Sequence, residues 1–219
     1  MKKETKKSFY IAVSMFVAFM LWTAAICFVD VKEIGPNHSS VGFSTVNKFF
    51  HSLTGVNFML YTITDWLGLV PVFISFVFGV LGLVQWIKRK NLFKVDYSIL
   101  VLGLFYIAVM AVYLFFEECV VNYRPVLING YLEASYPSST TLLVMCVMPT
   151  AVMQFNLRIK NVLFRRCVAI AGISFIAFMI IGRLLSGVHW LTDIIGGALL
   201  STGLVMMYCF INSLKISNR

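Results

Sequence analysis

Long uncharged apolar runs dominate this chain of 219 residues. Only 12% of the residues are charged and 60% are hydrophobic, a balance that excludes an ordinary soluble domain. A helix needs roughly 20 apolar residues to cross the hydrocarbon core of a bilayer. We therefore expect an all-α integral membrane bundle of six transmembrane helices, forming a single domain over residues 1–219. Five of the runs are long: residues 8–29, 66–87, 97–116, 134–157 and 194–214. The sixth, residues 167–182, is shorter and ends at Arg183.

The positions of the basic residues indicate how these helices are oriented. With the N-terminus in the cytoplasm, the cytoplasmic segments carry 14 of the 18 Lys and Arg residues. Because cytoplasmic loops are enriched in Lys and Arg, we expect both termini inside the cell. Membrane-flanking residues also account for the net charge of +9, so we expect no nucleic-acid partner. Four basic residues remain for the outer side: Lys32, Lys48, Arg124 and Arg183.

The first outer loop, residues 30–65, contains a short amphipathic pattern. The segment "STVNKFFHSL" places four apolar side chains on one helical face. This pattern predicts a short helix lying in the outer membrane interface, and an ordinary packed loop helix is the alternative. The apolar side chains are Val46, Phe49, Phe50 and Leu53.

The cysteines give no indication of a metal or of redox chemistry. The chain has five of them, and no two have metal-ligand or C-x-x-C spacing. In or beside apolar helices, cysteine acts as a small apolar residue. We expect no metal and no cofactor.

Polar residues gather at the outer end of the predicted bundle. The stretch "YPSSTT" opens the fourth helix there, so the N–H groups and positive dipole end of that helix favour an anion. Ser138 and Ser139 add hydroxyl donors. Arg124 and Arg183 lie at the same end, and their guanidinium groups suit phosphate oxygens. The pattern indicates a phosphate-binding site.

A histidine and an aspartate open the sixth helix at this end, in "GRLLSGVHWLTDIIGG". His189 and Asp193 are four residues apart, so on one helical face the carboxylate would accept a ring N–H. That contact would leave the other ring nitrogen free to act as a nucleophile or a base. A structural hydrogen bond is the alternative for the pair alone. The position of this pair beside the two arginines favours a functional role, since ionisable residues in membranes are functional candidates.

These residues resemble the type 2 phosphatidic acid phosphatase superfamily, which includes the vanadium haloperoxidases. The family pattern has a Lys, six residues and Arg-Pro; then Pro-Ser-Gly-His; then Ser-Arg, five residues, His, three residues and Asp. The chain matches it at Arg124-Pro125, at Pro137-Ser138, and in the third part at Arg183, His189 and Asp193, with five and then three residues between them; Gly182 stands where the third part has Ser.

The resemblance implies a membrane lipid phosphatase with a phospho-histidine intermediate. His189 would be the nucleophile and Asp193 its orienting group, while Arg124, Arg183 and Ser138 would hold the phosphate. Two positions depart from the pattern: Glu117 replaces the lysine, and Ser139 with Thr140 replaces Gly-His. A threonine hydroxyl is too weak an acid to replace imidazole.

The expected function is a phosphatase or phosphotransferase for a lipid phosphate or diphosphate, such as a polyprenyl diphosphate. We expect it in a bacterial plasma membrane among membrane lipids, with its site facing outside; the sequence identifies no protein partner. The first alternative is a catalytically weak or inactive relative that binds lipid phosphate headgroups. A small transporter is a third reading, but the chain has no clear internal repeat.

Overall fold

The computed structural model describes residues 3–217, which form a bundle of long helices. Within these residues, six stretches are long and apolar enough to cross a membrane. Many large apolar side chains on the bundle surface are exposed, among them Met20, Phe73 and Ile107, as expected where helices face lipid. The chain is an integral membrane protein. Its helices are α1 (Lys3–Phe28), α2 (Ser44–Thr54), α3 (Phe58–Leu67), α4 (Leu69–Arg89), α5 (Tyr97–Glu118), α6 (Ser139–Arg158), α7 (Val162–Leu185) and α8 (Leu191–Ser217).

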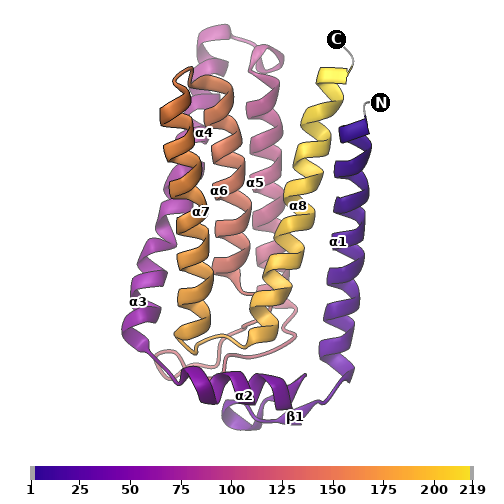
Figure 1. Cartoon of the computed structure of the whole chain (residues 1–219), viewed down its shortest axis with the longest axis vertical. Helices are drawn as coiled ribbons and strands as arrows, with labels where there is room; N and C mark the ends of the chain where they lie inside the picture. The colour runs from indigo at the N-terminus through magenta and orange to yellow at the C-terminus, as the bar shows by residue number, and fades with distance from the viewer. Residues whose placement is uncertain (1–2, 218–219) are drawn as a thin grey trace.

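Both described ends of the chain lie at one end of the bundle, and α2 lies across the other (Figure 1). We call the end that α2 covers the site end. α1 packs along α8, and α6 packs against both α7 and α8. The buried core lies between α5, α6 and α8, where Phe105, Leu142 and Tyr208 are among its members. A short ribbon of β1 (Lys32–Glu33) and β2 (Ser40–Val41), with the 3-10 turn η1 (Pro36–His38), lies at the site end, and η2 (Leu92–Lys94) joins α4 to α5.

The six expected transmembrane helices are present, but their bounds differ from the apolar runs in an informative way. The second span begins at Phe58, eight residues before the apolar run, because α3 continues into α4 through Gly68. The fourth helix begins at Ser139, because Ser138 caps it and residues 134–138 form a loop. The fifth span extends beyond the short run on both sides, over Val162–Leu185.

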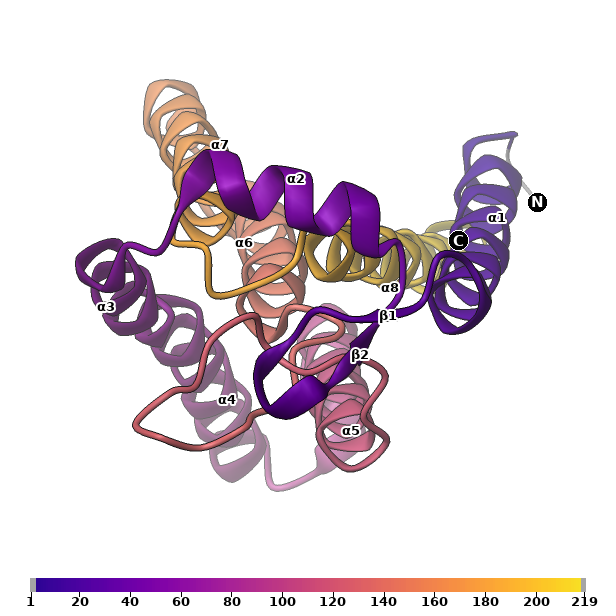
Figure 2. The ribbon, with the colours of Figure 1, turned by 90° about the horizontal axis from the view of Figure 1, so that it is seen from below.

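The amphipathic helix expected in the first loop is α2. It crosses the site end beneath α7 and α8 (Figure 2). Asn47 attaches it there, because the side-chain amide donates to Thr192 Oγ1 and Gly42 O while its oxygen accepts from Thr192 N. Phe49 and Leu53 of the predicted apolar face are exposed, as an interfacial helix requires.

Candidate functional site

A hairpin in the loop between α5 and α6 supplies three side chains to the site. Main-chain hydrogen bonds join Arg124 N to Glu133 O and Ser135 N to Asn122 O. The hairpin reverses at Asn129-Gly130, where both residues have positive φ, as Asn-Gly turns require. Because alternate residues of an extended strand point the same way, Asn122 and Arg124 can face the bundle together.

The loop between α7 and α8 carries His189, which is 4% exposed. Gly187 fixes this loop against the preceding segment. It has φ of +66°, and a Cβ added there would lie 1.8 Å from Gly55 O. The main-chain N–H of Asn57 also donates to Ser186 O. Only glycine fits this close approach, so the loop that presents the histidine is held in one position.

A serine hydroxyl connects His189 to Asp193. Arg124 Nη1 lies 3.2 Å from His189 Nε2. Since a guanidinium group only donates, Nε2 accepts and the ring proton resides on Nδ1. Nδ1 then donates to Ser135 Oγ at 3.0 Å, and Ser135 Oγ donates to Asp193 Oδ2 at 2.5 Å.

This arrangement differs from the direct contact that the i, i+4 spacing led us to expect. Nδ1 of His189 and Oδ2 of Asp193 are 3.9 Å apart, too far for a hydrogen bond. The physical reason is that His189 precedes α8, which begins at Leu191, so the two residues do not share one helical turn. Ser135 occupies the space between them.

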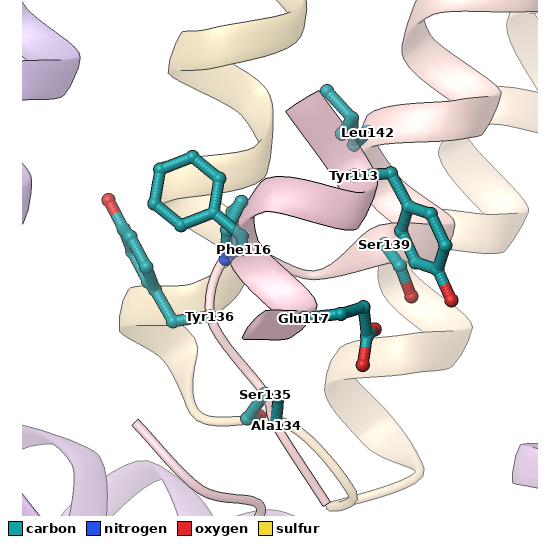
Figure 3. Close-up of a pocket in the computed structure, with 9 residues that line it drawn as sticks. Tyr113, Phe116, Glu117, Ala134, Ser135, Tyr136, Ser139 and Leu142 are labelled. Carbon is teal, nitrogen blue, oxygen red and sulfur yellow. The ribbon is translucent and has the colours of Figure 1, made fainter. Parts of the chain in front are cut away.

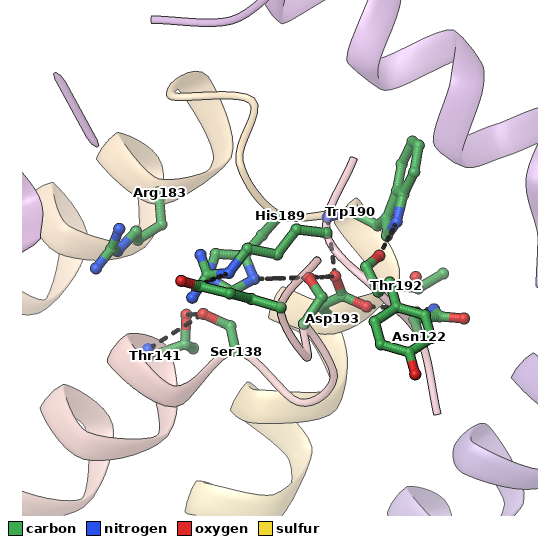
Figure 4. Close-up of polar contacts among 12 residues, drawn as sticks. Asn122, Ser138, Thr141, Arg183, His189, Trp190, Thr192 and Asp193 are labelled. Carbon is green, nitrogen blue, oxygen red and sulfur yellow. Dashed lines mark hydrogen bonds and ion pairs between the residues drawn. The ribbon is translucent and has the colours of Figure 1, made fainter. Parts of the chain in front are cut away.

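Asp193 is fully buried and is held by three donors. One oxygen accepts from Ser135 and from the main-chain N–H of Trp190 at 2.9 Å, and the other accepts from Asn122 Nδ2 at 3.3 Å (Figure 4). Both carboxylate oxygens therefore act as hydrogen-bond acceptors for groups from the hairpin and from the start of α8. Asp193 can therefore fix the serine hydroxyl, and through it the proton on His189.

The side chains of Arg124 and Arg183 are both buried, and they contact different residues. Arg124 forms an ion pair with Glu133 at 3.0 Å as well as its contact with His189. Arg183 donates from Nε to Thr140 Oγ1 and from Nη2 to Asp65 Oδ1, and its guanidinium carbon lies 4.9 Å from the Tyr61 ring centre. Nη1 of Arg183 is buried and has no hydrogen-bond partner among the described residues. An anion would satisfy this donor.

The serines predicted to bind phosphate lie at the N-terminus of α6. The Oγ atom of Ser138 accepts from Thr141 N and Thr141 Oγ1, so this residue is the N-cap. Its own hydroxyl hydrogen remains available for donation. Ser139 is the first residue of the helix and lines a small cavity together with Ser135 and Glu117.

The positions that depart from the family pattern also lie at the site. Glu117, at the last turn of α5, lines the small cavity and projects on the same side as the hydroxyls of Tyr113 and Ser139 (Figure 3). The Thr140 hydroxyl accepts from Arg183 and so orients that guanidinium. Thr140 therefore supports the arginine, and its hydroxyl is no substitute for an imidazole acid.

A larger cavity leads away from the site between α4, α5 and α6. Its volume is about 450 Å³, and most of its wall is apolar. Arg183, Thr140 and Asp65 line it together with residues such as Val72 and Val147. We call it the lateral cavity. It shares Tyr113, Ser139 and Leu142 with the small cavity beside Ser135, so the two adjoin.

The surroundings of His189 keep its imidazole neutral. Burial, together with the positive charges of Arg124 and Arg183, lowers the pKa of His189 well below its usual value near 6.5. The residue lies between the spans Val162–Leu185 and Leu191–Leu214. A neutral ring leaves the Nε2 lone pair available for attack over the physiological pH range.

This protonation state can be measured directly, because the chain contains three histidines. In protein labelled with ¹⁵N-histidine, we expect the His189 ring to stay neutral with its proton on Nδ1 as the pH falls from 7 through 6. The direction follows from a pKa lowered by burial and by two cations. Comparison with His189→Ala assigns the signal. Protonation of His189 at or above pH 6.5 would contradict this description of the site.

Several residues of the site were not predicted from the sequence. Ser135 and Asn122 lie in the hairpin, for which the dipeptide Asn129-Gly130 was an available signal. Asp65 was placed in a loop, whereas it lies in α3 and reaches Arg183. All the predicted residues do lie at the site end, where His189, Arg124 and Asp193 are joined through direct contacts and Ser135.

The fold and this site define an integral membrane protein with a buried histidine and two buried arginines at one end of a six-span bundle. Residues 112–215, which carry every predicted site residue, match the model of the PAP2 superfamily. The resemblance found in the motifs is therefore confirmed by a match to this family model over just under half of the chain.

A solved structure supports the same fold. The crystal structure of a transmembrane PAP2-type phosphatidylglycerolphosphate phosphatase from Bacillus subtilis superposes with a TM-score of 0.62. The match covers 94% of this chain and 96% of that chain, at 19% sequence identity. At this identity the similarity establishes the arrangement of the helices. No sequence among the curated proteins is significantly similar to the chain.

Proposed function

We propose that the protein is a membrane lipid phosphatase or phosphotransferase that works through a phospho-histidine on His189. The observation that carries this proposal is a neutral, buried imidazole whose Nε2 contacts Arg124, beside Arg183 with an unpartnered Nη1. These features match the needs of a phosphate ester: a nitrogen nucleophile and donors for the anionic oxygens. The family and the fold support the same class of reaction.

The proposed first step uses the hydrogen-bond chain through Ser135. As a phosphate group binds, its oxygens draw Arg124 Nη1 from His189 Nε2 and take up the free donor of Arg183. Nε2 then attacks phosphorus, the N–P bond forms, and the bond to the leaving oxygen breaks. The proton on Nδ1 stays hydrogen-bonded to Ser135, which donates to Asp193, so the positive imidazolium is stabilised. Water or another acceptor then attacks phosphorus and releases the histidine.

The leaving group determines whether the absence of an acid at Thr140 matters. An alkoxide from a phosphate monoester is a poor anion and needs a proton, whereas the lipid monophosphate released from a lipid diphosphate is stable as an anion. We therefore propose lipid diphosphates as the preferred substrates. A protonated Glu117 is the alternative source of acid, and its place in the small cavity beside Ser135 allows a direct test.

Phosphate release from matched lipids distinguishes these routes. With purified protein, we expect a polyprenyl diphosphate to be cleaved at least about tenfold faster than the monophosphate, because a tenfold ratio needs only about 1.4 kcal/mol between the two barriers. In this route Glu117→Gln retains activity. If Glu117 supplies the acid, Glu117→Gln is inactive and the wild type also cleaves monophosphates. Equal rates for both lipids, with Glu117→Gln active, would contradict both routes.

We propose that the site faces the outside of the cell. The basic residues are concentrated at the opposite end of the bundle, where the described chain ends lie (Figure 1). A tag inserted at Asn129, in the hairpin turn, should be labelled in intact cells, and a reporter after Arg219 should remain cytoplasmic. Labelling of the Asn129 tag only after the membrane is opened would reverse the proposed orientation.

A second candidate function is binding of lipid phosphate headgroups without turnover. The observation that favours it is the occupation of both arginines by carboxylates, Glu133 on Arg124 and Asp65 on Arg183, with no imidazole at Thr140. Binding of a lipid diphosphate by wild-type protein that releases no phosphate from any lipid would favour this candidate.

A further inference from the structure

The residue in the N-cap position of α8 cannot cap the helix with its own side chain. Because α8 begins at Leu191, Trp190 takes the N-cap position and Asp193 is the third helical residue. An N-cap serine, threonine, asparagine or aspartate accepts a hydrogen bond from one of the first main-chain N–H groups of its helix. An indole is only a donor and cannot replace it. The acceptor for the first turn of α8 must therefore come from elsewhere.

Asn47 of α2 supplies this acceptor. Its side-chain oxygen accepts from the main-chain N–H of Thr192, the second residue of α8, at 3.3 Å. Its amide nitrogen donates to Thr192 Oγ1 at 3.0 Å and to Gly42 O at 2.8 Å. The Asn47 side chain is 0% exposed, so water does not compete for these bonds. One helix thus caps another, although 145 residues separate the two partners.

The first part of the chain holds Thr192 through each of its polar groups. Asn47 binds its N–H and its hydroxyl, and Trp22 Nε1 donates to its main-chain oxygen at 3.1 Å. The Trp22 ring stacks on Phe43, the residue before α2, with ring centres 5.1 Å apart. Thr192 directly precedes Asp193 in the chain, so α1 and α2 together fix the peptide that carries the carboxylate.

Asp193 completes the cap from the other side. Its Oδ2 accepts from the main-chain N–H of Trp190 at 2.9 Å, which is the contact from the third residue back to the N-cap in a capping box. The same oxygen accepts from Ser135 Oγ. The carboxylate that directs the proton on His189 is therefore part of the helix cap, and its position depends on how the first turn of α8 is held.

We propose that Asn47 is a positioning residue for the reaction at His189: by capping α8 from α2, it holds Asp193 in place against Ser135. Its effect on turnover rests on the proposed function. Without the Asn47 side chain, the buried N–H of Thr192 would lose its acceptor, and the first turn of α8 would shift to find another. A displacement of about 1 Å in a catalytic site can cost up to about 10²-fold in rate.

A double-mutant cycle distinguishes positioning from general stabilisation. With a lipid diphosphate as substrate, we expect Asn47→Ala to lower kcat about tenfold, or about 1.4 kcal/mol, and to change KM little. In the Asp193→Asn background the same change should lower kcat less than about twofold, because the carboxylate through which Asn47 acts is already gone. A tenfold loss in both backgrounds, or an unchanged kcat in folded Asn47→Ala, would overturn the proposal.

Two further variants control for stability. Asn47→Asp keeps an oxygen for the Thr192 N–H, so its kcat should exceed that of Asn47→Ala even though a buried charge lowers thermal stability. Asn161→Ala removes the N-cap side chain of α7 at the opposite end of the bundle, and it should lose stability without losing kcat. If Asn47→Asp is no more active than Asn47→Ala, or if neither Asn47 variant folds, Asn47 is a structural residue and the proposal is overturned.

The ring of His189 reports the same positioning without turnover. In protein labelled with ¹⁵N-histidine, we expect Asn47→Ala and Asp193→Asn to shift the Nδ1 signal of His189 in the same direction, because both weaken the hydrogen-bond chain through Ser135. Asn161→Ala should leave this signal unchanged. An identical Nδ1 signal in wild type and Asn47→Ala would overturn the proposal. The expected shift in a wild-type protein that shows no turnover would contradict the proposed function and support the positioning role.

Discussion

Replacing His189 by alanine is expected to abolish phosphate release while the protein remains folded. The imidazole supplies the attacking Nε2, and no other histidine is among the residues that contact it. Loss of a nucleophile costs on the order of 10⁶ in kcat in a serine protease, and we expect at least about 10⁴ here. The measurement is phosphate release from a lipid diphosphate by purified variant and wild type.

The matched control for this experiment is His38→Ala. His38 lies in the turn η1 at the site end, is exposed, and pairs only loosely with Glu33 at 3.8 Å. Wild-type turnover is expected from this variant. Turnover that survives in His189→Ala would exclude the phospho-histidine mechanism, whereas an unfolded His189→Ala variant would be recognised by its lost thermal transition.

Asp193→Asn is expected to lower kcat by about 10²- to 10³-fold, a smaller effect than the ~10⁴ seen when a protease triad loses its carboxylate. The carboxylate accepts hydrogen bonds from Ser135, Trp190 and Asn122. An amide would present an NH₂ group to some of these donors, so the Ser135 hydroxyl would lose its fixed acceptor. The proton on His189 Nδ1 would then no longer be directed.

The comparison variant is Glu33→Gln, which removes an exposed carboxylate at the site end. It should retain wild-type turnover and stability. Ser135→Ala should resemble Asp193→Asn, since both interrupt the same hydrogen-bond chain. Full activity in Asp193→Asn, with its fold intact, would mean that His189 needs no oriented proton.

The membrane spans could be predicted because a bilayer requires a fixed number of apolar residues, which a sequence displays directly. Helix bounds were less predictable. α3 contains Thr64 and Asp65, so the apolar run began only at Trp66, although the span begins at Phe58. Thr64 satisfies its hydroxyl within the helix by donating to Leu60 O, which makes a polar residue compatible with the span.

The sequence predicted residues of the site but not the hydrogen bonds that join them. Spacing alone placed Asp193 against His189, but spacing assumes that both lie on the helix. The serine between them comes from a hairpin more than fifty residues away, and no local pattern joins Ser135 to either partner. Likewise, the pairing of Arg183 with Asp65 depends on where α3 packs against α7.

Trapping the covalent intermediate tests the central claim most directly. Wild-type protein is mixed with a polyprenyl diphosphate labelled with ³²P in the terminal phosphate and stopped in alkali, in which phospho-histidine survives. We predict label on the peptide that contains His189, increased in Asp193→Asn if release of phosphate is slowed more than attack, and none in His189→Ala. Phosphate release by wild-type protein with no label on His189 at any time during turnover, or with label on another residue, would contradict the account.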